Sequence, residues 1–248
     1  MPTTNRLAIV TGASSGFGLA LCHSLVKKDW LVYGISRSQP AINQPNFKYI
    51  SCDLSQPTSV EKLIATLFEE VSQLPKTSIA ALVNSAGTIE PVDLVQNLDD
   101  TSAIVGSLTL NLASAIRLMS FVGKAFAGCD TRIVNISSGA ASKPYEGWAV
   151  YCSSKYGLKA ASEVFHKENK DSCSVYLLDP GPMATPMQDR LREIDEDSFP
   201  NKQRFVKMHE QGELTPVEEI VQEAEGFLSQ EMPPAWKSER YSGQHSTN

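Results

Sequence analysis

Short apolar runs alternate with longer amphipathic stretches along most of this chain. The runs are rich in Val, Ile and Leu, whereas the stretches between them repeat their apolar residues at helical spacing. The apolar runs occupy residues 7–10, 31–35, 79–83, 132–136 and 174–178, with a shorter third strand at residues 49–50, and the helical stretches occupy residues 19–28, 60–71, 100–126 and 150–167.

This alternation predicts an α/β fold with a parallel sheet. Strands that are apolar on both faces need helices on both faces, and right-handed crossovers then give a doubly wound, Rossmann-type sheet. The 248 residues, 42% of them hydrophobic, suit one such domain, so we predict a single domain over residues 1–248. Residues 183–212 break the alternation with polar and charged side chains. We predict a helical insertion over the active site there; a solvated helical surface layer is the competing interpretation.

A glycine-rich turn joins the first apolar run to the first helical stretch. It reads Thr-Gly-Ala-Ser-Ser-Gly-Phe-Gly over residues 11–18. Glycines let the backbone approach a pyrophosphate closely, and the first N–H groups of the following helix then face the phosphates. The residues predicted to bind a dinucleotide here are Gly12, Ser14, Ser15, Gly16, Phe17 and Gly18.

The end of the second predicted strand indicates which dinucleotide is bound. An acidic residue there would bond the 2′-hydroxyl of the adenosine ribose and repel a 2′-phosphate. This chain has Ser36 and Arg37 and no acid, so we predict NADP(H) rather than NAD(H), with Arg37 on the phosphate. Asp53, after the third strand, is a candidate acceptor for the adenine amino group. A surface arginine and a helix-capping aspartate are the competing interpretations.

Polar residues also lie beside the predicted cofactor site in the middle of the chain. Asn84, Ala86 and Gly87 follow the fourth strand, where Gly87 permits close approach of the backbone and Asn84 fixes neighbouring loops. Asn111 stands in an otherwise apolar stretch, and a buried amide needs partners. Holding a water that connects Lys155 to solvent and simple helix packing are both consistent with Asn111.

The turn that follows the last long strand completes the predicted cofactor site. Its backbone and one hydroxyl group are placed to bind the carboxamide of a nicotinamide ring. The residues concerned are Pro180, Gly181 and Thr185.

The reaction chemistry is predicted to lie with three residues at the carboxyl edge of the sheet. Ser138 ends the fifth strand, and Tyr151 starts the next helix with Lys155 four residues later on the same helix face. A free tyrosine has a pKa of about 10, and a nearby ammonium together with the positive nicotinamide of the oxidised cofactor lowers it. We therefore expect Tyr151 to deliver a proton to a carbonyl oxygen that Ser138 also hydrogen-bonds while hydride reaches the carbonyl carbon.

Composition excludes several other classes of function. The formal net charge of -6 and the lack of a basic run argue against nucleic acid and anionic membrane as partners. The five cysteines and four histidines have no metal-ligand spacing, so we predict no metal and reduced thiols. No signal peptide is visible and no apolar stretch is expected to span a membrane, which predicts a cytoplasmic protein.

Together these residues resemble the short-chain dehydrogenase/reductase family over nearly the whole chain. The resemblance implies that Asn111, Ser138, Tyr151 and Lys155 form a catalytic tetrad, and that the protein is a homodimer or homotetramer. A narrower similarity, resting on residues 16–18, 134–148 and 179–188, is to the sepiapterin reductase and benzil reductase branch. It implies NADPH-dependent reduction of vicinal dicarbonyls.

The resemblance also suggests where a flat conjugated carbonyl substrate binds. The apolar and aromatic candidates are Tyr145, Trp148, Met183 and Met187, although each is also suited to packing. Similar proteins continue beyond the length of this chain with a final strand and a tail that reaches the substrate pocket. The short segment before Asn248 therefore leaves a last strand and pterin specificity open.

Two rival functions remain at this point. One is an NAD-dependent alcohol dehydrogenase of the same family, against which Arg37 and the missing acid argue. The other is a dinucleotide-sensing protein without catalysis, against which the intact set of Ser138, Tyr151 and Lys155 argues.

Overall fold

Seven parallel strands form one sheet in the order β3-β2-β1-β4-β5-β6-β7. This computed structural model describes residues 5–74, 77–230 and 233–242. The strands are β1 (Arg6–Thr11), β2 (Leu31–Ser36), β3 (Phe47–Ser51), β4 (Ile79–Asn84), β5 (Asp130–Ile136), β6 (Cys173–Asp179) and β7 (Trp236–Arg240). The order reverses between β1 and β4, so the doubly wound α/β prediction is confirmed.

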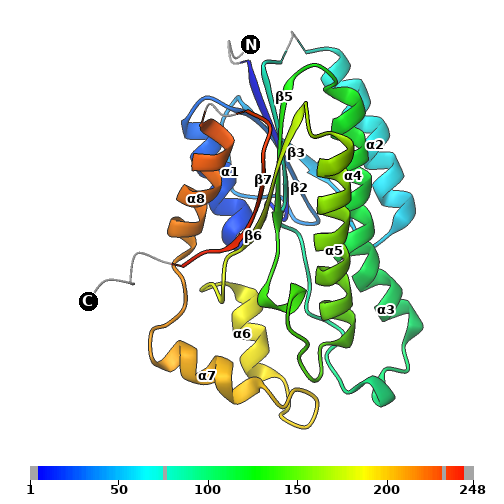
Figure 1. Cartoon of the computed structure of the whole chain (residues 1–248), viewed down its shortest axis with the longest axis vertical. Helices are drawn as coiled ribbons and strands as arrows, with labels where there is room; N and C mark the ends of the chain where they lie inside the picture. The colour runs from blue at the N-terminus through cyan, green and yellow to red at the C-terminus, as the bar shows by residue number, and fades with distance from the viewer. Residues whose placement is uncertain (1–4, 75–76, 231–232, 243–248) are drawn as a thin grey trace.

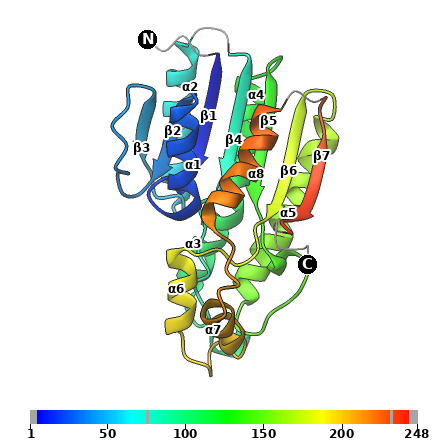
Figure 2. The same ribbon diagram turned by 90° about the vertical axis from the view of Figure 1, so that its left-hand side faces the viewer.

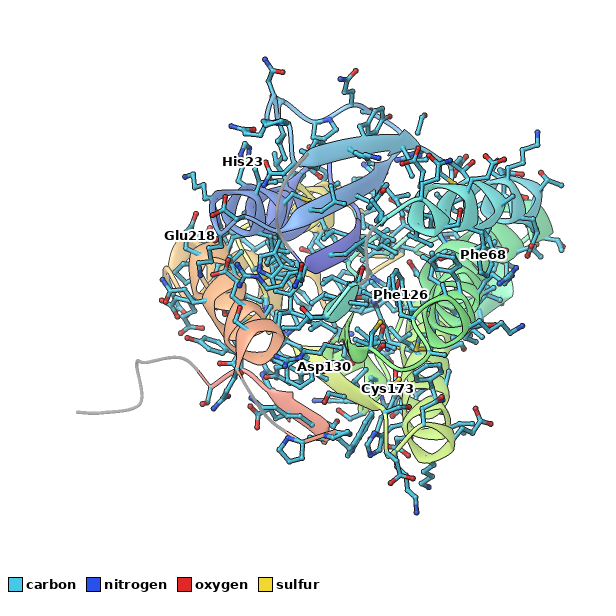
Figure 3. All side chains as sticks on the ribbon, turned by 90° about the horizontal axis from the view of Figure 1, so that it is seen from above. His23, Phe68, Phe126, Asp130, Cys173 and Glu218 are labelled. Atoms are coloured by element: carbon cyan, nitrogen blue, oxygen red, sulfur yellow. The ribbon has the colours of Figure 1, made fainter. Side chains whose placement is uncertain are left out.

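Helices cover both faces of this sheet (Figures 1 and 2). One face carries α1 (Gly16–Lys27) and α8 (Val217–Ser229), and the other carries α2 (Pro57–Ser72), α4 (Ser114–Ala125) and α5 (Ala149–Glu168). Figure 3 looks along the strands and places His23 of α1 and Glu218 of α8 on one side and Phe68 of α2 on the other. The central strands are therefore buried on both faces, as their continuous apolar runs require.

The long apolar stretch near the middle of the chain is helical but not uniform. It consists of α3 (Thr101–Leu108), one π-helical turn, η2 (Thr109–Ala113), and α4. Asp100 caps its start by accepting hydrogen bonds from the N–H groups of Ser102 and Ala103. A π turn inserts one extra residue into the helical ladder and often marks a functional site, and here it contains Asn111.

One expectation about membranes needs correction. Residues Thr101–Ala125 are long and apolar enough to cross a membrane by length and composition, although we expected no such stretch. The apolarity has another cause, because Leu118, Met119, Phe121 and Val122 of α4 are buried in the cluster that packs against the sheet. A buried core helix and a membrane-spanning helix both need apolar side chains, so their length and composition are alike.

Two short helices lie beyond the carboxyl ends of the strands. They are α6 (Pro186–Glu193) and α7 (Lys202–Glu210), at the lower end of the molecule in Figure 1. The predicted insertion at residues 183–212 is thus helical and lies at the edge of the sheet where ligands bind. The last strand, which the sequence left open, is present as β7 and pairs with β6. Residues 243–248 of the C-terminal segment lie outside the described residues.

Candidate active site

The glycine-rich turn between β1 and α1 is as tight as its sequence predicts. Gly12 and Gly16 have φ angles of 72° and 52°, which favour glycine. A Cβ added at Gly18 would lie 2.3 Å from the carbonyl oxygen of Gly12, so no side chain fits there. Ser15 is the N-cap of α1, but its hydroxyl accepts no hydrogen bond from the helix. The first N–H groups of α1 can therefore donate to a bound ligand. This is a cradle suited to phosphate oxygens.

Buried polar side chains fix the neighbouring loop after β4. The hydroxyl of Thr11 accepts hydrogen bonds from the N–H groups of Ser85 and Ala86, both at 3.0 Å. Asn84 donates to the side-chain oxygen of Asn135 on β5 at 2.8 Å. Asn84 therefore has the architectural role predicted for it, holding two strand ends together.

The ends of β2 and β3 carry the residues predicted for the adenosine half of a dinucleotide. The Ser36 hydroxyl donates to the carbonyl oxygen of Ser38 at 2.8 Å, and the Arg37 side chain is exposed. Oδ1 of Asp53 accepts from both the N–H and the hydroxyl of Ser55, and these bonds, more than the charge of Arg37, lower the pKa of Asp53. Asp53 thus shapes the turn before α2, although the N-cap residue itself is Gln56.

Tyr151, Lys155 and Ser138 converge on one pocket at the carboxyl edge of the sheet. Tyr151 and Lys155 lie one turn apart near the start of α5, and the Lys155 ammonium is 5.6 Å from the centre of the Tyr151 ring. Lys155 donates to the carbonyl oxygen of Ile136 at 2.9 Å, which ties α5 to the end of β5. Ser138 follows that strand end and hydrogen-bonds Tyr151. A carbonyl oxygen between Ser138 and Tyr151 would meet two hydroxyl donors.

Burial sets the ionisation of this pair in a direction that the sequence did not indicate. Loss of solvation raises the pKa of Tyr151 to about 12, against a smaller lowering by its hydrogen bond to Ser138. The same cause lowers the pKa of Lys155 to about 8. We expected the Lys155 ammonium and the positive nicotinamide of the oxidised cofactor together to lower the tyrosine pKa. For the protein alone the direction is the opposite, and the effect of the cofactor remains a prediction.

Asn111 is held by protein groups on every side of its amide. Its oxygen accepts from the N–H of Thr88 at 2.8 Å, and its nitrogen donates to the carbonyl oxygen of Thr88 at 2.8 Å and to the Ser154 hydroxyl at 3.3 Å. These bonds connect the π turn to the loop after β4 and to α5. The side chain therefore ties the π turn to the two segments beside it, as the packing interpretation expects, and its holding of a water that connects Lys155 to solvent remains a prediction.

Most of the predicted residues line one cavity of about 450 Å³. They are Gly12, Ser15, Gly16, Phe17, Ala86, Gly87, Ser138, Tyr145, Trp148, Tyr151, Lys155, Pro180, Gly181, Met183, Thr185 and Met187. Seven others do not line it, namely Ser14, Gly18, Ser36, Arg37, Asp53, Asn84 and Asn111. Ser36, Arg37 and Asp53 are at the ends of β2 and β3, beyond β1, while Asn84 and Asn111 support the wall from behind.

The outer wall of the cavity is aromatic. Trp148 is buried and contacts Tyr145 and Tyr151 edge to face, with ring centres 5.5 and 5.1 Å apart. It also stacks on Phe199, which precedes α7, at 4.6 Å. The α6–α7 segment is thus fastened to the start of α5 by aromatic packing. A flat conjugated ligand would complete the same kind of contact.

Sequence reasoning missed the polar residues at the mouth of the cavity. Asp179 directly precedes the Pro180–Gly181 turn and could have been identified from that position. The others carry no local signal: Glu90 is in the loop after β4, and the place of the rest depends on how α6, α7 and β7 fold back over the site. These other residues are Glu90, Gln188, Arg190, Arg204 and Arg240.

No group of three or more potential metal ligands occurs in residues 5–74, 77–230 and 233–242. All five cysteines are free thiols, four of them buried.

Comparison with known proteins agrees with this geometry. The family profile described as short chain dehydrogenase matches residues 6–196. The chain is 32% identical over 216 residues to a benzil reductase ((S)-benzoin forming) of Bacillus subtilis, covering 84% of this chain and 87% of that protein. It is 28% identical over 227 residues to the sepiapterin reductase of Rattus norvegicus, covering 84% and 85% respectively.

Solved structures show the same fold. A short chain dehydrogenase/reductase from Saccharomyces cerevisiae superposes with a TM-score of 0.82 at 22% identity, covering 96% of this chain and 97% of that one. A 4-hydroxyisoleucine dehydrogenase solved with NADH gives a TM-score of 0.79 at 19% identity, covering 98% and 100%.

Proposed function

Since this chain belongs to the short chain dehydrogenase family, and is therefore an oxidoreductase that uses a nicotinamide dinucleotide, we propose that it is an NADPH-dependent carbonyl reductase. Its substrate is a small conjugated ketone or vicinal diketone, benzil-like or sepiapterin-like. The observation that carries the proposal is the meeting of Ser138, Tyr151 and Lys155 in a cavity with an aromatic wall, next to the glycine turn.

The cofactor fits the residues that are present. The turn from Gly12 to Gly18 can take phosphate oxygens because no side chain caps the first N–H groups of α1, and the wall of the cavity continues to Thr185. When bound, the reduced dinucleotide supplies the hydride. Arg37 would hold the 2′-phosphate at the exposed end of β2, which supports NADPH over NADH.

In this proposal the chain's own residues handle the oxygen and the proton. Ser138 donates a hydrogen bond to the carbonyl oxygen, and Tyr151 gives that oxygen its proton. Burial raises the pKa of Tyr151, so the side chain is protonated at neutral pH and the proton is available as negative charge develops on the oxygen. Lys155, held by the Ile136 carbonyl, lies beneath the ring and stabilises the tyrosinate that remains.

Two expectations are carried into this proposal from the sequence. The enzyme acts in the cytoplasm, consistent with five free thiols. It is a homodimer or homotetramer, and size-exclusion chromatography with light scattering would measure which.

The test follows oxidation of NADPH and NADH with 1-phenyl-1,2-propanedione, benzil and sepiapterin. Tyr151→Phe keeps the ring and removes the proton donor, so turnover should fall by at least about 100-fold. Tyr156→Phe is the matched control, because Tyr156 is an exposed tyrosine of the same helix. Equal turnover by the Tyr151 variant, or no turnover of any carbonyl by wild type, would refute the proposal.

The cofactor choice has its own test. Arg37→Ala should lower kcat/KM for NADPH about 10- to 100-fold and leave that for NADH nearly unchanged, because only NADPH has the phosphate. Arg117→Ala, which removes an arginine paired with Glu61 on the far helix layer, is the control. An unchanged preference in Arg37→Ala would contradict the assignment of NADPH to this residue.

A further inference from the structure

Two arginines at the mouth of the cavity form no salt bridge among the described residues, unlike their neighbour Arg190. Arg190, also at the mouth, pairs with Glu90 at 3.0 Å and with Glu193 at 3.3 Å. Arg204 and Arg240 line the same cavity, and neither forms a salt bridge in the part of the chain that the structure describes. Guanidinium groups at a ligand site without a carboxylate are suited to bind one.

Arg240 reaches the site from the end of β7, beside the residue that carries the oxygen-binding hydroxyl. Its Nη1 lies 3.9 Å from the Cβ position of Gly139, the residue after Ser138. Its Nη2 lies 3.6 Å from the Cβ position of Gly181, in the turn after β6. The guanidinium therefore lies between the two loops that border the cavity, and the missing side chains of both glycines leave room for it.

Arg204 approaches the same place from α7. Its Nη1 donates to the Tyr145 hydroxyl at 3.4 Å, and its guanidinium carbon is 6.0 Å from the centre of the Tyr145 ring. That hydroxyl lies 3.5 Å from the Cβ position of Gly139, the point that Arg240 also approaches. The two cations thus converge on one side of the cavity, with Tyr145 between them.

The acidic groups nearby do not cancel both cations. Glu90 is taken by Arg190. One oxygen of Asp179 accepts from the N–H of Gly181 at 3.0 Å, and the other lies 3.8 Å from the Cβ position of Gly139. Asp179, the register partner of Arg240 across β6 and β7, balances the charge of Arg240 at most. Arg204 shares a second hollow with Glu213 and Lys207, whose charges offset each other, so the positive charge of Arg204 is left in excess. Lys143, 5.8 Å from the centre of the Tyr145 ring, adds to it.

We propose that the substrate carries a carboxylate in addition to its reactive carbonyl, and that Arg204 and Arg240 bind it. The inference rests on the proposed function and narrows it: the preferred compound is an anionic, conjugated dicarbonyl rather than a neutral one. The aromatic wall takes the flat part of the molecule, the carbonyl meets Ser138 and Tyr151, and the carboxylate lies toward Gly139 and Tyr145.

Three matched compounds test this: 1-phenyl-1,2-propanedione, its 4-carboxy derivative and the methyl ester of that derivative. Wild type should use the carboxylate with a kcat/KM at least about tenfold above that for the ester, mainly through a lower KM. In Arg204→Gln and Arg240→Gln this ratio should fall toward one. Arg190→Gln is the control and should keep the ratio, because its guanidinium is already paired.

Calorimetric binding of the same compounds to the enzyme saturated with NADP⁺ makes the result independent of turnover. Tighter binding of the carboxylate than of the ester, lost in the two variants, supports the proposal even where no compound is reduced. Equal binding of carboxylate and ester by wild type, or a preference that survives both substitutions, overturns it. Turnover of the neutral diketone with no carboxylate preference would leave the reductase standing and remove only this inference.

Discussion

Replacing the buried lysine should make the folded protein more stable while removing its activity. Lys155 is almost fully buried, and loss of solvation lowers its pKa from 10.5 to about 8. Near pH 7 the group is charged in both the folded and the unfolded chain, so the fold bears the cost of holding an ammonium away from water. Lys155→Met keeps a similar length and volume and removes this cost.

The magnitude follows from the two pKa values. A drop from 10.5 to about 8 corresponds to about 3 kcal/mol at roughly 1.4 kcal/mol per unit. Methionine also loses the bond to the Ile136 carbonyl, which offsets about 1 kcal/mol. We therefore expect the free energy of unfolding to rise by about 2 kcal/mol near pH 7, with carbonyl reduction lost.

The pH dependence distinguishes this explanation from better packing. A lysine with a lowered pKa destabilises the fold below its folded value, and wild-type stability recovers as pH rises from about 8 to 10.5. The advantage of the variant should therefore shrink across that interval, vanish within it and become a deficit of about 1 kcal/mol at its upper end, where only the lost hydrogen bond to Ile136 counts. Urea unfolding at several pH values measures the difference, with Lys167→Met, an exposed lysine of the same helix, as control. A stability difference that is negative near pH 7, or flat with pH, would refute the reasoning.

Three further substitutions test the structure. Arg132→Met should cost about 3 kcal/mol in urea unfolding, because this buried side chain is hydrogen-bonded to carbonyl oxygens at the end of α8; unchanged stability would contradict that role. Lys28→Met should cost about 1–3 kcal/mol by leaving the buried Glu225 carboxylate unpaired, and a second change, Glu225→Gln, should recover part of it. Gly147→Ala should displace the segment before α7, because its Cβ would lie 2.3 Å from the Ser198 carbonyl oxygen. KM should therefore rise more for carbonyl substrates than for NADPH, and an equal rise in the two KM values would contradict this reasoning.

The sequence predicts those parts of the site that depend on short, local patterns of residues. The turn at residues 11–18 stands between a strand and a helix, and Tyr151 and Lys155 share one helix face by spacing alone. Parallel strands bring their carboxyl ends to one edge, so Ser138 could be placed near them without a structure. The same reasoning gave the sheet and its helical layers.

What could not be predicted depends on contacts between distant segments. Arg204 and Arg240 reach the cavity only because α7 folds over the sheet edge and β7 pairs with β6, and no local pattern marks either residue. The direction of the Tyr151 pKa depends on burial by its neighbours, which spacing does not reveal. Arg37 lies at the end of β2, where the sequence predicts it, and the preference for NADPH that we attribute to it remains a prediction.

The residues that shape the outer wall of the cavity and the residues proposed to carry out the reaction come from different segments of the chain. Residues 186–210 supply much of the outer wall of the cavity, yet the residues that we propose to move the proton and hold the dinucleotide come from strand ends and α5. Substitutions in that segment can therefore change which molecule enters without altering the reaction itself. Divergence of substrate range within such a lineage, or its redirection in the laboratory, is expected to proceed through this stretch first.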